Sequence, residues 1–220
     1  MLIAEKLYLL MADDSEKPET VVSATGYGMN AAIITDLMIA GRVALSEDQH
    51  RQIHLIGAGP CPDPVLAAPL EKLEKRGNLS LDEAVKINSL CDARSLTDSL
   101  AKAGIIEYGE RTLLGLGKQR VRLINQQIQR QIRTDLQGAL HGQKIPGTSD
   151  TTVLAILQAI GLVNHVLEDE LAPMSGSQAQ SRIAELAQDS PAADSAQRAV
   201  AAMNAAIVTQ RVIPPAPGKK

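Results

Sequence analysis

Aromatic side chains are almost absent from this sequence. It contains no Trp and no Phe, and its only aromatic residues are Tyr8, Tyr27 and Tyr108. Proteins that bind RNA or single-stranded DNA stack bases on aromatic faces, so this scarcity argues against a base-stacking platform. The net charge of −3 also argues against a chain that binds polyanions over its whole surface. Nucleic acid is therefore a disfavoured partner.

Cysteine clusters and long hydrophobic runs are missing as well. Cys61 and Cys91 are the only cysteines, and they fit no metal-ligand spacing, so we expect two free thiols in a cytoplasmic protein. The N-terminus carries a short apolar run flanked by acidic residues, which is not the pattern of a signal peptide. No run approaches the ~20 apolar residues that span a bilayer. We therefore expect any membrane contact to be peripheral.

The sequence offers no arrangement of residues that suggests catalysis. His50 and His54 are four residues apart, but they fall on a predicted hairpin arm, so they should not share a metal ion. Residues 57–59 read Gly-Ala-Gly, which is too short for a dinucleotide-binding fingerprint. No nucleophile, acid and base can be grouped together. We accordingly predict no catalytic residue, no metal site and no cofactor, and a protein that is not an enzyme.

The stretch that organises the chain is residues 28–45, GMNAAIITDLMIAGRVAL. Between residues 29 and 40 every residue is apolar or small except Asn30, Thr35 and Asp36. A helix that is apolar on nearly all sides is normally buried. Gly41 should end this helix, because glycine readily adopts the left-handed conformation of a helix C-terminus.

Start and stop signals predict the other elements. Asp63 should cap a helix that has Pro64 at its first position; the alternative is a start near Ala68, because Pro69 would otherwise lie in the helix interior. Residues 80–83 fit a capping box for a short helix that reaches about residue 90. Further helices are expected at residues 2–12, 93–103, 124–140, 152–171 (capped by Ser149 or Asp150), 182–187 and 195–211. Two hairpins are expected, one pairing 42–45 with 53–56 and the other pairing 105–108 with 113–116 and 117–123. Residues 20–25 should form a short strand or an extended segment.

These elements predict a mainly α fold: a single domain over residues 1–212, built around a buried central helix with two small β-hairpins. Residues 213–220 should form a flexible tail.

Six pieces of the chain, in this order, resemble the Golgi phosphoprotein 3 family. They are AEKLYLLMADD at 4–14, the block at 28–45, PCPDPVL at 60–66, LTDSLAKAGII at 96–106, ERTLLGL at 110–116 and TVLAILQAIGLVNHVL at 152–167. The sequence is more similar to the bacterial-type members. The resemblance implies a mostly helical domain, recruitment to membranes through the headgroup of phosphatidylinositol 4-phosphate, and an adaptor role that holds glycosyltransferases in the Golgi. It also implies that copies can associate through their hairpins.

The positions that bind the headgroup in Golgi members are changed in this sequence. Those members use a tryptophan and an arginine near the start of the central helix, and two basic residues before the second hairpin. The corresponding residues here are Val21, Asn30, Leu90 and Ala93. None of them matches, so the resemblance assigns no headgroup ligand to this chain.

Basic residues concentrate between residues 110 and 133. The segment contains one acidic residue, Glu110, and six basic residues: Arg111, Lys118, Arg120, Arg122, Arg130 and Arg133. If residues 119–123 form a strand, Arg120 and Arg122 share one face and Val121 and Leu123 the other.

We predict that Leu113, Leu114, Leu116, Lys118, Arg120 and Arg122 contact an anionic lipid surface or a phosphoinositide headgroup. The leucines would be buried in the bilayer, and each basic side chain near the headgroups contributes ~1 kcal/mol. In the alternative interpretation, the leucines close the core and the arginines are solvated. The expected function is a peripheral lipid-binding adaptor without catalysis. The alternatives are a protein-only interaction scaffold that has lost the lipid site and, less favoured, a winged-helix-like nucleic-acid binder formed by residues 80–123.

Overall fold

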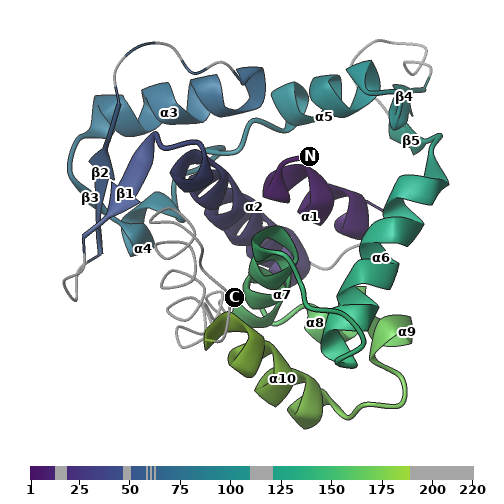
Figure 1. Cartoon of the computed structure of the whole chain (residues 1–220). Helices are drawn as coiled ribbons and strands as arrows, with labels where there is room; N and C mark the ends of the chain where they lie inside the picture. The colour runs from purple at the N-terminus through teal and green to yellow at the C-terminus, as the bar shows by residue number, and fades with distance from the viewer. Residues whose placement is uncertain are drawn as a thin grey trace, which may run out of the picture.

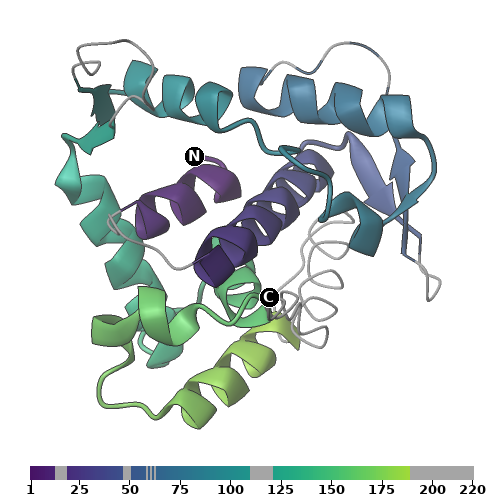
Figure 2. The same ribbon diagram turned by 180° about the vertical axis from the view of Figure 1, so that it is seen from behind.

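The computed structural model describes residues 1–12, 19–46, 51–57, 59, 61, 63–109 and 121–188, with the side chains of 19–24 left aside. The predicted helix at 195–211 and the predicted tail at 213–220 lie outside these residues. Within them the fold is mainly α with two small antiparallel sheets, as predicted. Figures 1 and 2 show helix α2 in the middle of the molecule, with the other elements arranged around it.

Helix α2, Glu19–Ile39, is the buried central helix that the apolar stretch predicts. Residues 31–37 are at most 7% exposed, and this includes Asp36 and Thr35. The prediction of a strand or extended segment at residues 20–25 was wrong, because α2 already begins at Glu19. The Thr-Val-Val run favours a strand locally, but strand propensity is weak and tertiary context overrides it.

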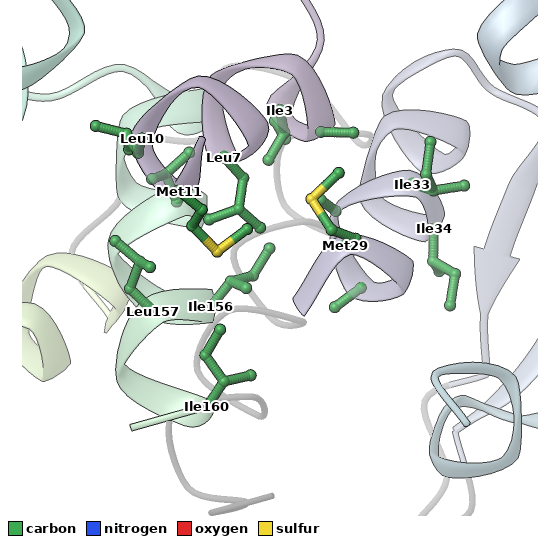
Figure 3. Close-up of a cluster of buried hydrophobic side chains, with 14 of the residues drawn as sticks. Ile3, Leu7, Leu10, Met11, Met29, Ile33, Ile34, Ile156, Leu157 and Ile160 are labelled. Atoms are coloured by element: carbon green, nitrogen blue, oxygen red, sulfur yellow. The ribbon is translucent and has the colours of Figure 1, made fainter. Parts of the chain in front are cut away.

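Helices α1 (Ile3–Met11) and α7 (Thr148–Ala159) pack against α2 to form the core. Figure 3 shows Leu7 and Met11 from α1 beside Ile156 and Leu157 from α7. Gly28 permits a close approach of α2 and α7, because a Cβ atom there would lie 2.8 Å from Cδ1 of Ile160.

The first sheet contains the predicted hairpin and one additional strand. Gly41 ends α2 with φ +65°, and β1 (Val43–Leu45) then pairs with β2 (Gln52–Leu55). Strand β3, Leu79–Ser80, pairs with the other edge of β2, so this is a three-stranded antiparallel sheet.

Two capping predictions are confirmed between the sheets. Helix α3, Pro64–Arg76, begins at the predicted proline, and the Asp63 carboxylate accepts the Val65 N–H at 2.8 Å. Ser80 and Glu83 form the capping box of α4, Leu81–Ala84. This helix is shorter than predicted, because it stops at Ala84 instead of continuing to about residue 90.

Helix α5, Ala93–Lys102, leads into the second hairpin, in which β4 (Ile106–Tyr108) pairs with β5 (Val121–Leu123). Helix α6, Gln126–Leu140, follows directly and packs against α1. These elements confirm the predicted helices at 93–103 and 124–140 and the pairing of 105–108 with the end of the second arm at 121–123. The rest of that predicted arm, residues 113–120, lies outside the described residues.

The predicted helix at residues 152–171 is instead three helices. Helix α7 ends where Gly161 adopts φ +72° and the Leu162 N–H bonds to the Leu157 carbonyl at 2.9 Å. Two short helices follow, α8 (Val163–Val166) and α9 (Glu168–Leu171). The N-cap of α7 is Gly147, so the prediction of Ser149 or Asp150 was also wrong. Helix α10, Gly176–Gln188, extends the helix predicted at 182–187 in both directions.

Candidate functional site

The second hairpin orients its β5 side chains as predicted. The register pairs Glu107 with Arg122 and Tyr108 with Val121. Val121 and Leu123 are partly buried against the core, whereas Arg122 faces solvent. The Nε of Arg122 donates to the Glu107 carboxylate at 2.7 Å, and its Nη2 donates to the same oxygen. Because this pair is largely exposed, it contributes little to stability.

Most of the predicted membrane-contact residues lie in the connection between β4 and β5. Leu113, Leu114, Leu116, Lys118 and Arg120 are all outside the described residues. Arg122 is described, and it lies at the base of the hairpin on the exposed face. The pairing of Tyr108 with Val121 brings the two ends of the connection together.

The basic residues of the 110–133 segment do not all face the same way. Arg130 is exposed on α6. Arg133, in contrast, points toward α9, where its Nη1 donates to both carboxylate oxygens of Glu170 at 3.0 and 3.1 Å and to the Val166 carbonyl at 2.9 Å. Arg133 therefore joins two helices and does not belong to a basic surface.

Asn30, at a position that the resemblance assigns to the headgroup, is part of the core here. Its side chain is 6% exposed. The amide nitrogen donates to the carbonyls of Val85 and Ile87, both at 2.8 Å, and the amide oxygen accepts the Cys91 N–H at 3.0 Å. In a continuing helix that N–H would bond to Ile87 instead. Asn30 thus diverts the chain after α4, which explains why α4 is short.

The neighbouring positions offer no cation either. Leu90 is fully buried, and Ala93 is the first residue of α5. Asp92 caps α5 by accepting the Arg94 and Ser95 N–H groups, and the Ser95 hydroxyl holds the pKa of Asp92 below its usual range. This carboxylate occupies the helix end at which an anion would otherwise bind. Arg94 is exposed and lies 3.9 Å from the carboxylate of Asp98. Residue 21 belongs to α2, and its side chain is not described.

The most perturbed carboxyl group in the described structure is that of Asp36. It is 4% exposed, and its two oxygens accept the Ile3 and Ala4 N–H groups at 2.9 and 3.0 Å. Asp36 therefore caps the N-terminus of α1 from the middle of α2. Burial raises its pKa to about 7, against the opposing effect of these two hydrogen bonds, and the nearby Glu5 adds to the rise. The only sequence signal was a lone Asp in an apolar helix, which does not reveal its partners.

The described histidines and cysteines show no catalytic or metal-binding grouping. His54 is exposed on β2, and the Nε2 of His141 lies 2.9 Å from the Glu170 carbonyl. Across the described ranges, no three His, Cys, Asp or Glu side chains gather where a metal ion could be held. Cys61 and Cys91 are free thiols, as predicted. None of the described helices combines the length and apolarity needed to cross a bilayer.

Comparison with known proteins gives one family match. The family model described as Golgi phosphoprotein 3 (GPP34) matches residues 3–203. A search of curated proteins gives no match.

Proposed function

Because this chain belongs to the Golgi phosphoprotein 3 family, we propose that it is a peripheral membrane adaptor without catalytic activity. It binds the cytoplasmic surface of membranes that contain anionic lipid and holds a protein partner there.

The observation that carries this proposal is the geometry of the β4–β5 hairpin. Its strand pairing joins the two ends of a connection whose sequence contains Leu113, Leu114, Leu116, Lys118 and Arg120. Leucines beside basic residues suit an anionic bilayer, because the apolar groups leave water while the charges remain at the headgroups. Each basic side chain near the surface contributes ~1 kcal/mol, so Lys118, Arg120 and the neighbouring Arg122 give a binding that salt weakens strongly.

The lipid that fits this surface is defined by its charge and not by a particular headgroup. A stereospecific phosphoinositide site needs cations in fixed positions. Here both N–H donors of Asn30 are bound to backbone carbonyls, Leu90 is buried and Asp92 places a carboxylate beside Ala93. We therefore propose recognition of anionic lipid in general.

Liposome flotation tests this function. The full chain is mixed with neutral vesicles, vesicles containing phosphatidylserine, or vesicles containing phosphatidylinositol 4-phosphate, each at low and high salt. We expect flotation with both anionic vesicles at low salt and its loss at high salt. Changing Leu113, Leu114 and Leu116 together to Ser should abolish flotation.

The matched control changes three exposed apolar residues outside this hairpin. Leu55, Ile56 and Ile145 are 43%, 41% and 80% exposed, and their replacement by Ser should leave flotation intact. Binding only to the phosphoinositide vesicles would contradict recognition by charge. Equal loss in both triple variants would contradict the role of the hairpin.

A protein-only scaffold is the second candidate, and the Asn30 contacts favour it. Two of the four positions that the resemblance assigns to the headgroup, Asn30 and Leu90, are buried in the core of this chain. The absence of flotation under every condition would leave this function as the better one.

A further inference from the structure

The outer face of the paired strands β4 and β5 consists of one acidic and one basic side chain. Side chains alternate along a strand, so Glu107 and Arg122 point away from the core. In Figures 1 and 2 this hairpin lies at the edge of the molecule, between α5 and α6. We propose that Arg122 binds the phosphate of an anionic lipid and that Glu107 competes for the same guanidinium, which restrains membrane binding. This role of Glu107 rests on the membrane function proposed above and adds a regulator to it.

The inner face of the hairpin is fixed to the core, and this keeps Arg122 on the outside. Ile106 and Leu123 pack against the core. The Tyr108 hydroxyl reaches α5, where its partners are the Thr97 hydroxyl at 2.8 Å and the Asp98 carboxylate. Because the hairpin is held along this side, the opposite side is presented to solvent in one orientation.

Glu107 binds the guanidinium at the edge that an oxyanion uses. The Nε of Arg122 donates to one carboxylate oxygen of Glu107 at 2.7 Å, and Nη2 donates to the same oxygen. Two parallel N–H groups of this kind form the fork with which arginine binds a carboxylate or a phosphate. The side chains of Arg122 and Glu107 are 73% and 44% exposed. A lipid phosphate can therefore reach the fork without any movement of the core.

The membrane surface favours exchange of Glu107 for a lipid phosphate. An exposed ion pair is weak in water, because both charges are hydrated and screened. An anionic surface attracts basic side chains, and it repels acidic ones by the same field. The sequence of the hairpin, residues 106–123, has four basic and two acidic residues. Loss of the Glu107 charge raises the net charge of this segment from +2 to +3 and leaves the Arg122 fork open.

Partition of the full chain onto phosphatidylglycerol vesicles at low salt tests the proposal, because the phosphate is the only charged group of this lipid. Four proteins form a double-mutant cycle: wild type, Glu107→Gln, Arg122→Gln and the double variant. We expect Glu107→Gln to bind at least about fivefold more tightly than the wild type. In the Arg122→Gln background the gain from the same change should be at least about threefold smaller, because no guanidinium is released.

The cycle separates competition from simple repulsion. If Glu107 only repels the membrane, its replacement gives the same gain with and without Arg122. Arg122→Lys keeps the charge but loses the fork, so Glu107→Gln combined with Arg122→Lys should bind more weakly than Glu107→Gln alone.

A second exposed pair supplies the matched control. On α3, Lys75 donates to Glu71 at 2.6 Å, and these side chains are 72% and 62% exposed. Glu71→Gln removes the same charge from a similar pair outside the hairpin and should leave partition unchanged. Circular dichroism confirms that each variant is folded.

Three results would overturn the proposal: no gain in Glu107→Gln, an equal gain in the presence and absence of Arg122, or an equal gain from Glu71→Gln. If the wild type binds the vesicles and one of these results is found, the competition by Glu107 is wrong while the membrane function stands. If the wild type does not bind at all, the membrane function fails and the role of Glu107 fails with it.

Discussion

Replacement of Asp36 by Asn should change how the stability of the protein depends on pH. The Asp36 carboxyl group is buried between α1 and α2, and its pKa rises from 3.8 to about 7. A carboxyl group whose pKa is raised by folding stabilises the folded state fully below its unfolded pKa. That contribution is lost as the pH rises through the folded pKa. Asp36 should therefore make the protein more stable at pH 5 than at pH 8.

The size of the effect follows from the two pKa values. A difference of three units corresponds to about 4 kcal/mol between the extremes of pH, and about 2–3 kcal/mol of this is lost between pH 5 and pH 8. Asp135 and Asp92 have lowered pKa values, so they titrate below this window. The replacement also leaves one of the Ile3 and Ala4 N–H groups facing an amide nitrogen, which costs about 1–3 kcal/mol at any pH.

Urea unfolding followed by circular dichroism, at several values between pH 5 and pH 8, measures this dependence. The free energy of unfolding of the wild type should fall across the window, and the difference between wild type and Asp36→Asn should shrink by about 2–3 kcal/mol. Groups that titrate alike in both proteins cancel in the difference. A difference that stays constant with pH would refute the assignment of a raised pKa to Asp36.

Three further substitutions test contacts that hold the fold together. Asn30→Leu leaves the Val85 and Ile87 carbonyls without their partner, and should lower the free energy of unfolding in urea by about 2–4 kcal/mol. Glu170→Gln removes the charge that faces Arg133, whose side chain is 26% exposed, and should cost about 2 kcal/mol. Asp63→Ala removes the cap of α3 and should cost about 1 kcal/mol, measured as a lower Tm.

Controls for these substitutions come from exposed residues of similar chemistry. Asn88→Leu and Glu74→Ala replace exposed side chains near α4 and on α3, and should change stability by less than about 0.5 kcal/mol. If Asn88→Leu were as destabilising as Asn30→Leu, the hydrogen bonds of Asn30 would not be the cause.

The contacts of Asn30 also bear on how the family's fold is used in this chain. An arginine at this position needs an exposed, anion-facing environment, whereas Asn30 lies beneath the turn that follows α4. The same place in the fold is therefore a structural junction here. The Asn30 amide holds the connection between α4 and α5 in place. The hairpin after α5 has a connection that contains leucines and arginines.

The sequence alone was sufficient for features that depend on neighbouring residues. Asp63 with Pro64, the box from Ser80 to Glu83, and Gly41 each mark a helix end by local backbone chemistry, and the structure has all three. The apolar stretch likewise identified α2 as the buried helix, because a helix that is apolar on nearly all sides is normally buried. The ordered motifs identified the family, which the match over residues 3–203 shows.

Only the tertiary structure determined the features that depend on residues far apart in the chain. Asp36 caps a helix 33 residues before it, and Asn30 shortens a helix by bonding to carbonyls 55 and 57 residues after it. Gln129 ties α6 to α1 through a carbonyl 120 residues away. A buried polar group must find a partner, but the sequence around it does not say which distant backbone atom will be within reach. That is decided when α1, α2 and α6 pack together.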